Sequence, residues 1–268
     1  MSVSSAWPAP SLRASIMAQL RVILALMIRE GQSSYTQETL GFFWVVAEPL
    51  ILTCGVIALW TLGDRTHGHA SISVVAMALS AYTHLQLWRL GVLPSMNIIK
   101  HGGWLLYHRN VNIFDVIVAH VFMKSVSIFA SFVIIASVAL LLEVIEPIRD
   151  PGLLIAAWGL DTLFVLSSAT FISGFAAMNE YVEKIMHPLM YLTLPFTGAF
   201  TLTSWVPTSL RVYLAWSPLA NCCEMFRAAM FPLSIKTYYS VPLILGSSLF
   251  LLAIGLPVMF YARRDVVV

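Results

Sequence analysis

Long runs of apolar residues follow one another along the chain, with short polar segments between them. A helix needs about 20 mostly apolar residues to cross a bilayer core of about 30 Å. The runs are continuous, whereas the strands of a membrane β-barrel would alternate apolar and polar positions. We therefore predict an all-α membrane protein with six transmembrane helices. These spans are predicted at about residues 44–63, 72–91, 113–142, 153–177, 185–203 and 241–261.

A narrower apolar stripe precedes the first predicted span. Its members recur at steps of three and four residues, the spacing of one helix face; they are Leu12, Ile16, Leu20, Ile23, Leu24 and Met27. Arg13 and Arg21 lie off this stripe, as in a helix that lies flat in the membrane surface. We predict that residues 1–43 form the N-terminus with this interfacial amphipathic helix and that residues 44–268 form the transmembrane domain. A leader helix without such a role is the alternative.

The segment at about residues 204–240 is too long for a tight turn and too apolar for an ordinary loop. Pro207, Pro218 and Pro232 divide it into short pieces, and aromatic residues such as Trp205 punctuate it. Irregular backbone is tolerated at membrane depth only where protein or a water-filled cavity satisfies it. We predict two short helices between spans five and six that dip into the periplasmic side of the membrane and return, as a re-entrant segment.

The composition excludes a soluble protein and a nucleic-acid binder. Only 10% of the 268 residues are charged and 59% are hydrophobic, whereas a soluble domain carries roughly 25% charged residues. The 15 Lys and Arg residues form no dense basic patch of the kind that binds nucleic acid. Most of them fall on one side of the predicted spans, so the positive-inside rule predicts that both termini are cytoplasmic.

The sequence carries no motif for catalysis. The three cysteines and the histidines lack metal-ligand spacing, so we expect no metal site. No GxxxxGKS or GxxxxGKT phosphate-binding loop occurs, so the chain does not bind ATP by that route. The acidic residues are scattered, whereas a membrane-embedded enzyme such as a lipid transferase would cluster acids or histidines at one interface. We therefore expect neither a catalytic site nor a cofactor in this chain.

Three blocks of the sequence carry a resemblance to a known family. The first is REGQSSY at 29–35 with LGFFW at 40–44, the second is LLYHRNV at 105–111, and the third is EKIMHPLMY at 183–191 with EMFR at 224–227. In this order, and over most of the chain, the blocks resemble those of ABC-2-type permeases. Within that class they are most similar to the capsular polysaccharide exporters.

The resemblance implies a homodimeric permease that works with two ATP-binding-cassette ATPase subunits, which would bind the ATP and Mg²⁺. It implies export of a lipid-linked capsular polysaccharide across the bacterial inner membrane, together with periplasmic and outer-membrane export proteins. Other substrates stay open as alternatives: O-antigen or a teichoic-acid-type polymer carried by the same machinery, or a drug or lipid as in the wider ABC-2 class.

The resemblance also implies residues that couple the permease to its ATPases. They lie at the end of the N-terminal helix and in the loop between spans two and three: Arg29, Lys100, His101, Tyr107, His108 and Arg109. Charges at the rim of a docking surface fix register more than affinity. The alternative is that the basic residues serve only the positive-inside topology.

Aromatic residues are candidates for the polysaccharide path, because their apolar faces can stack on the C–H faces of sugar rings. The candidates are Trp44, Tyr82, Trp88, Tyr191, Phe196, Phe200 and Trp205, together with Asp161 inside the fourth span. The alternatives are interface anchors for the aromatic residues and a structural acid for Asp161. Glu224 and Arg227 share a helix face and are candidates for an outer gate, with a solvated surface pair as the alternative.

Overall fold

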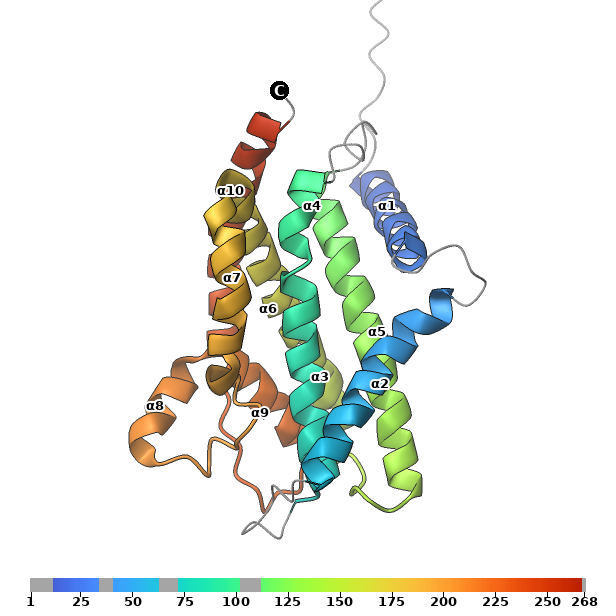
Figure 1. Cartoon of the computed structure of the whole chain (residues 1–268), viewed down its shortest axis with the longest axis vertical. Helices are drawn as coiled ribbons and strands as arrows, with labels where there is room; N and C mark the ends of the chain where they lie inside the picture. Colours follow the sequence, from blue (N-terminus) through green and yellow to red (C-terminus); the bar gives the residue numbers. More distant parts are fainter. Residues whose placement is uncertain (1–11, 34–40, 63–71, 102–111, 267–268) are drawn as a thin grey trace, which may run out of the picture.

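The structure is a computed structural model that describes residues 12–33, 41–62, 72–101 and 112–266. Within these ranges the chain forms helices joined by turns, and no strand (Figure 1). In chain order they are α1 Leu12–Ser33, α2 Gly41–Leu62, α3 Val74–Val92, α4 Ser95–His101, α5 Ile113–Leu141, α6 Pro151–Met178, α7 Glu180–Leu192, the 3₁₀ turn η2 Leu194–Thr197, α8 Thr208–Trp216, α9 Pro218–Met230 and α10 Val241–Val266. The all-helical prediction is therefore confirmed for the described residues.

Three helices are long and apolar enough to cross a membrane: Ile113–Leu141, Pro151–Met178 and Val241–Ala262. A shorter apolar stretch, Val46–Leu62, lies in α2. α3 differs because it carries polar side chains, among them Thr83 and Gln86, and these are buried. α3 thus lies inside the bundle, where neighbouring helices can satisfy polar groups that lipid could not.

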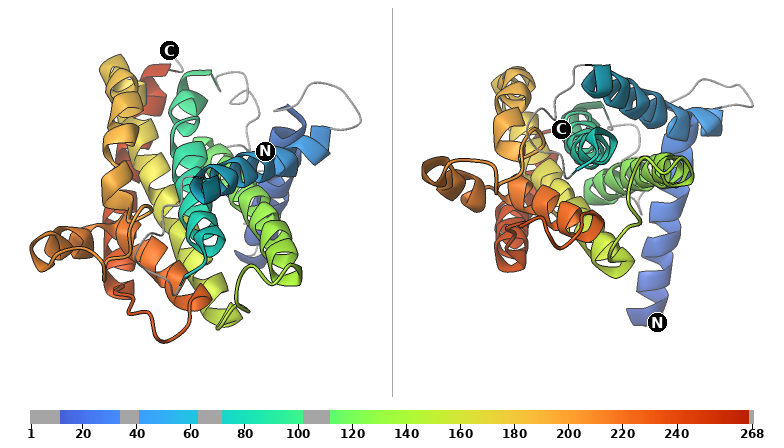
Figure 2. Two further views of the ribbon diagram at one scale, coloured as in Figure 1. Left: turned by 60° about the horizontal axis from the view of Figure 1, so that its bottom comes forward. Right: turned by 90° about the horizontal axis from the view of Figure 1, so that it is seen from below.

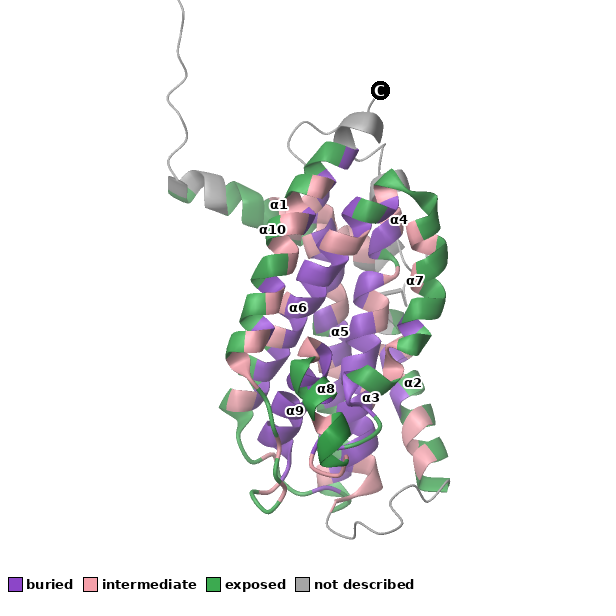
Figure 3. Cartoon of the chain, turned by 90° about the vertical axis from the view of Figure 1, so that its left-hand side faces the viewer, coloured by how far each residue is buried: buried purple, intermediate pink, exposed green. Residues whose placement is uncertain are grey.

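The long helices run side by side, and α1 lies across one end of the bundle (Figure 3). α4 and the C-terminal end of α10 lie at that same end, whereas α8 and α9 lie toward the other (Figure 1). The view from below shows α1 extending away from the bundle (Figure 2). α1 thus lies outside the bundle that the long helices form.

The apolar stripe of α1 divides between two faces. Leu20 and Leu24 are exposed, together with Met17 and Ile28, whereas Ile23 and Met27 turn partly toward the protein. The steps of three and four residues are helical, as predicted; part of the stripe packs on the bundle and part is exposed.

The prediction of a fifth span over residues 185–203 is wrong in extent, because α7 ends at Leu192. Pro195 lies in the first turn of η2, where its missing N–H costs nothing. Gly198 then takes a left-handed conformation with φ 69°, which favours glycine. The chain therefore turns before residue 203 instead of continuing as a helix.

The prolines of the segment 204–240 delimit its helices as predicted. Pro207 is the N-cap residue of α8, and Pro218 stands at the start of α9. Pro232 follows the C-cap residue Phe231. Two short helices are thus confirmed; α9 is buried against the bundle and α8 is mostly exposed (Figure 3).

α6 and α10 pack closely because glycines lie at their crossing. A Cβ at Gly255 would lie 2.8 Å from the backbone of Phe171, and a Cβ at Gly174 would lie 3.0 Å from the backbone nitrogen of Met259. A side chain at Gly255 would force the backbone of Phe171 to shift, and one at Gly174 would require Met259 to move by a few tenths of an ångström. These two helices, with α5, form the scaffold against which α3 and α9 are positioned.

Candidate functional site

A groove of about 270 Å³ lies between α2, α3 and the turn around η2. Its walls are mostly apolar and aromatic; the lining residues are Leu52, Val56, Trp60, Ala81, Tyr82, Leu85, Gln86, Arg89, Leu90, Leu194 and Phe200. Trp60 and Phe200 stack with their ring centroids 6.0 Å apart. The groove therefore combines two of the predicted path residues, Tyr82 and Phe200, with an aromatic residue from α2.

Two polar residues of α3 enter this groove. The Gln86 side chain donates to the Pro49 carbonyl oxygen at 3.2 Å, which joins α3 to α2. The guanidinium carbon of Arg89 lies 5.5 Å from the ring centroid of Tyr191 on α7, a cation–π contact. Tyr191, another predicted path residue, thus lies beside the groove, and it is exposed.

The opposite face of α3 is buried against α6 and contributes one polar pair and one aromatic stack. His84 Nδ1 and Asp161 Oδ2 lie 2.8 Å apart, and both side chains are buried. Four residues along α3, Trp88 stacks on Phe164 with centroids 6.0 Å apart. At 100° per residue, positions 84 and 88 lie on the side of α3 away from positions 82 and 89.

Asp161 and Trp88 are therefore not among the groove residues. Asp161 pairs with His84 of a neighbouring helix, and Trp88 packs in the protein core. Their assignment to the polysaccharide path stays a prediction. The remaining path candidates do not line the groove: Trp44 is exposed in the first turns of α2, Phe196 is exposed in η2, and Trp205 packs against the core.

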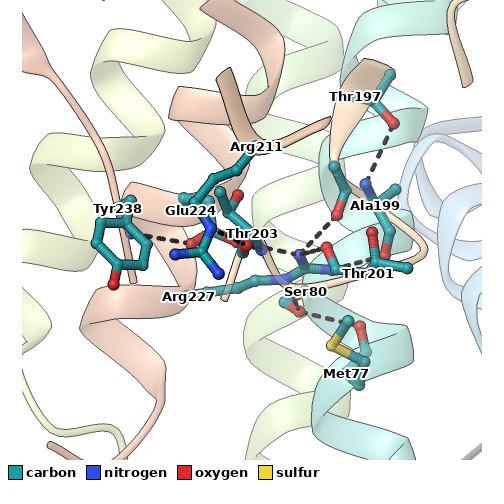
Figure 4. A network of polar contacts seen from close by, with 11 residues as sticks. Met77, Ser80, Thr197, Ala199, Thr201, Thr203, Arg211, Glu224, Arg227 and Tyr238 are labelled. Carbon is teal, nitrogen blue, oxygen red and sulfur yellow. Dashed lines mark hydrogen bonds and ion pairs between the residues drawn. The ribbon is translucent and has the colours of Figure 1, made fainter. Parts of the chain in front are cut away.

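Glu224 and Arg227 of α9 form the centre of a buried network (Figure 4). Arg227 Nη1 donates to the carbonyl oxygens of Gly198 at 2.7 Å and Thr201 at 3.0 Å, and Nη2 donates to that of Ala199 at 2.6 Å. These carbonyls belong to the turn after η2. The buried guanidinium of Arg227 thus fixes the backbone of the turn that carries the groove residue Phe200.

The same network reaches two further parts of the chain. Arg227 Nε donates to Ser80 Oγ on α3 at 3.3 Å. Glu224 accepts from the backbone nitrogens of Thr203 at 3.0 Å and Tyr238 at 3.1 Å, and its Oε1 lies 3.8 Å from Arg227 Nη1. The pair is therefore not a solvated surface pair, because it ties α9, α3 and two non-helical segments together.

α1 is joined to α5 by two polar contacts. Gln19 donates to Asp115, which also caps the start of α5 through Asn112. Glu30 Oε1 lies 2.9 Å from His120 Nδ1. The hydrogen bond with His120, together with the charges of His120, Lys124 and Arg29, lowers the pKa of Glu30 despite partial burial, which opposes the shift. The carboxylate form of Glu30 therefore stabilises the docked α1.

The predicted coupling residues fall at one end of the molecule as far as the structure describes them. Arg29 is half-buried near the end of α1, beside Glu30. Lys100 and His101 end α4 at the same end of the bundle (Figure 1). Tyr107, His108 and Arg109 lie outside the described residues.

Among the groove residues that were not singled out from the sequence, three have aromatic or polar side chains: Trp60, Gln86 and Arg89. A polar pair at positions 86 and 89 inside an apolar run is a signal that could have been used, because an ionisable group in a span is a functional candidate. Trp60 carries no such signal. No group of three or more potential metal ligands occurs within ranges 12–33, 41–62, 72–101 and 112–266.

Proteins of known function resemble this chain over most of its length, whereas no family model matches it. It is 30% identical over 244 residues to the capsule polysaccharide export inner-membrane protein CtrC of Neisseria meningitidis serogroup A, covering 91% of this chain and 92% of that protein. It is 28% identical over 242 residues to BexB of Haemophilus influenzae, which bears the same description, covering 90% of this chain and 91% of the relative.

A more distant relative is the polysialic acid transport protein KpsM of Escherichia coli, which is 23% identical over 262 residues, 94% of this chain and 97% of KpsM. The match to CtrC spans nearly the whole of both proteins. This chain therefore belongs to the family of capsule polysaccharide export inner-membrane proteins.

Proposed function

We propose that this chain is the inner-membrane permease of a capsular polysaccharide exporter and that the groove between α2, α3 and η2 forms part of the polymer's path. The observation that carries the function is the 30% identity to CtrC over about nine-tenths of both proteins. The chain is a transport subunit, and we assign it no catalytic residue.

The chemistry of the groove supports its role in the path. Stacked Trp60 and Phe200, with Tyr82 nearby, offer aromatic faces on which sugar rings can pack. Gln86 offers a polar group among the apolar walls. A few polar groups in a mostly apolar site can orient a ligand without binding it too tightly for release.

The helices support a six-span topology. We propose that α2, α3, α5, α6, α7 with η2, and α10 cross the membrane, that α1 lies in its cytoplasmic surface, and that both termini are cytoplasmic. α8 and α9 would then form the re-entrant segment on the periplasmic side. The position of α1 and the end of α10 at the same end of the bundle supports this arrangement (Figure 1), as does the distribution of Lys and Arg.

We further propose the assembly that the sequence resemblance implies. Two copies of the chain would enclose the conduit, and two ATPase subunits, which bind ATP and Mg²⁺, would dock at the end where α1 and α4 lie. The substrate would be a lipid-linked polymer that periplasmic and outer-membrane export proteins receive. The groove supports a dimer because a single copy does not enclose it fully.

The network of Glu224 and Arg227 supports a role at the outer end of the path. It fixes the turn that carries Phe200, and it does so from α9, at the end of the bundle opposite α1 (Figures 1 and 4). We propose that this turn forms the outer gate and that the buried pair holds its shape.

The test is the location of the polymer in a strain that lacks this protein. Cells are fractionated, and polysaccharide is quantified at the surface and in the cytoplasm. We expect polymer to accumulate inside and to return to the surface when the wild-type chain is expressed. The variant Trp60→Ala is expected to restore export poorly, because it removes the stacked pair in the groove.

The matched control is Phe250→Ala, which removes an exposed aromatic ring from α10, away from the groove. This variant should restore export like the wild type. Normal surface polysaccharide without internal accumulation in the deletion strain would refute the export function. Full export by Trp60→Ala would leave the function in place but remove the groove from the path.

A further inference from the structure

Arg89 is the single charged side chain among the residues that line the groove. A guanidinium group stays ionised at physiological pH. Its removal from water is costly unless an anion or a set of hydrogen-bond acceptors compensates it. The neighbours of Arg89 therefore decide whether its charge is satisfied within the protein.

Two other arginines in the structure are satisfied by backbone carbonyls. Arg227 donates to three carbonyl oxygens, at 2.6–3.0 Å. Arg211 also donates to three, those of Thr203 at 3.1 Å and of Ser204 and Val206 at 3.2 Å. Both side chains thus use their N–H groups to hold the fold, as structural arginines do.

Arg89 has no such set of acceptors. Among the described residues, its side chain makes the cation–π contact with Tyr191 at 5.5 Å and has neither a hydrogen bond nor a carboxylate within ion-pair distance. The cation–π contact supplies no oxygen acceptor, so among the described residues the N–H groups of the guanidinium have no hydrogen-bond acceptor. Arg89 is one of the residues that line the groove.

We propose that Arg89 binds an anionic oxygen group of the lipid-linked substrate, either in its polymer or in its lipid headgroup. The group is a carboxylate or a phosphodiester, either of which accepts two parallel hydrogen bonds from a guanidinium. This inference rests on the proposed function of the groove. It adds a site for a charged group to a surface that otherwise recognises sugar faces.

The position of the site agrees with a bound chain of sugars. Arg89 lies seven residues beyond Tyr82 on α3, which is about 10 Å along the helix axis. One part of the ligand can therefore stack near Tyr82 and Trp60 while its anionic group contacts Arg89. The contact of Arg89 with Tyr191 preorients the guanidinium, which reduces the entropy lost on binding.

The test compares binding to the purified full-length permease in detergent micelles by isothermal titration. Three probes are used: maltohexaose as a neutral glycan, hexagalacturonate as a carboxylated glycan, and dioctanoyl phosphatidylglycerol as a lipid phosphodiester. We expect Arg89→Gln to lower the affinity for an anionic probe at least about tenfold, the scale of a lost charge-assisted hydrogen bond. Maltohexaose should bind the variant like the wild type.

The matched control is Lys184→Gln. Lys184 is exposed on α7, and its ammonium nitrogen lies 5.5 Å from the ring centroid of Tyr181, so the control removes one charge and one cation–π contact outside the groove. It should leave the affinities for all three probes unchanged. Arg89→Lys keeps the charge but loses the planar guanidinium group, so its affinity for the anionic probes should lie between those of the wild type and Arg89→Gln.

The two anionic probes distinguish the source of the group. A loss confined to hexagalacturonate assigns the site to carboxylates of the polymer, and a loss confined to phosphatidylglycerol assigns it to a lipid headgroup; either result supports the proposal. The proposal is overturned if neither anionic probe binds the wild type, or if both bind Arg89→Gln with unchanged affinity. It is also overturned if the variant loses as much affinity for maltohexaose as for the anionic probes.

The export assay separates this inference from the proposed function. If the strain that lacks the protein keeps normal surface polysaccharide, the proposed function fails. If export requires the chain but Arg89→Gln exports and binds anionic probes like the wild type, only the anion site fails, and Arg89 then serves to pack α3 against Tyr191.

Discussion

Three buried charged residues, Arg227, Glu224 and Asp161, each have at least one polar partner in the described part of the protein. Arg227 has carbonyl oxygens and Glu224 around it, and Asp161 has His84. A buried charge that loses its partner costs far more than the pair contributes. Each of these residues can therefore be tested by the stability of the fold, separately from transport.

Arg227→Gln should destabilise the protein by about 3–5 kcal/mol, because it leaves Glu224 and three backbone carbonyls without their cation. The measurement is thermal unfolding of the purified protein in detergent. Arg149→Gln, at an exposed position, is the control and should unfold like the wild type. An unchanged unfolding temperature for Arg227→Gln would contradict the structural role of the network.

His84 and Asp161 should show coupled effects in a double-mutant cycle. His84→Ala and Asp161→Ala should each destabilise the protein by about 1–3 kcal/mol, because each leaves a buried polar partner behind. The double variant should lose less than the sum of the single losses, since the interaction can be lost only once. Strictly additive losses, measured by unfolding in detergent, would show that the pair contributes no interaction energy.

At the scale of the helices, α1 depends on its polar contacts with α5. The folded-state pKa of Glu30 is lowered by His120, so the unfolded chain binds a proton at a higher pH than the folded one. Stability from this contact is therefore complete above the ordinary pKa of 4.5 and is lost as the pH falls through the lower folded-state value.

The prediction compares the wild type with Glu30→Gln by thermal unfolding between pH 7 and about pH 3. The wild type should be the more stable protein at neutral pH, and its advantage should shrink as the pH falls below 4.5, because Glu30 becomes protonated. Glutamine at position 30 does not titrate, so the stability of the variant at each pH is the reference for the stability of the wild type. A difference that stays constant across this range would show that the charge of Glu30 does not stabilise the docked helix.

The close crossing of α6 and α10 can be tested on a single helix. Gly255→Ala should destabilise the protein by about 1–3 kcal/mol, because the new Cβ would lie 2.8 Å from the backbone of Phe171. Gly246→Ala is the matched control on α10, where a Cβ meets no atom within 4 Å. The control should be neutral or slightly stabilising, since alanine favours a helix. Equal effects of the two variants on unfolding would argue against the crossing.

The sequence predicts where the helices begin and end better than which side of each helix contacts which neighbour. α5 runs from Ile113 to Leu141 and α10 begins at Val241, close to the predicted bounds, because apolar runs and their polar ends mark where a helix can lie in lipid. The turn after α7 was missed because Pro195 and Gly198 interrupt an apolar run whose hydropathy does not change. Arg227 stabilises that turn from a distant part of the chain.

The candidate site could be predicted only in part, because α3 is buried on several sides. Tyr82 and Trp88 are both aromatic, yet one lines the groove and the other packs on α6. Polar and apolar side chains are both buried on α3, so the periodicity of the sequence does not tell which face meets which neighbour. The grouping of Tyr82 with Trp60 and Phe200 depends on tertiary packing, which composition and spacing do not encode.

At the scale of the whole molecule, different helices lie at the two ends of the bundle. α1, α4 and the end of α10 lie at one end, and α8 lies toward the other (Figures 1 and 2). α8 projects from the bundle and exposes Tyr213 and Trp216. If the proposed topology is right, these ends face opposite compartments.

Labelling of single cysteines tests this orientation in spheroplasts with a membrane-impermeant maleimide. In a chain whose three native cysteines are replaced by serine or alanine, Ser209→Cys on exposed α8 should be labelled without lysis. Arg13→Cys, on exposed α1, should be labelled only after the membrane is permeabilised. The reverse pattern would place α1 outside the cell membrane, where no cytoplasmic ATPase could reach it. Labelling of both positions before lysis would break the six-span topology, because the two ends of the bundle would then share a compartment.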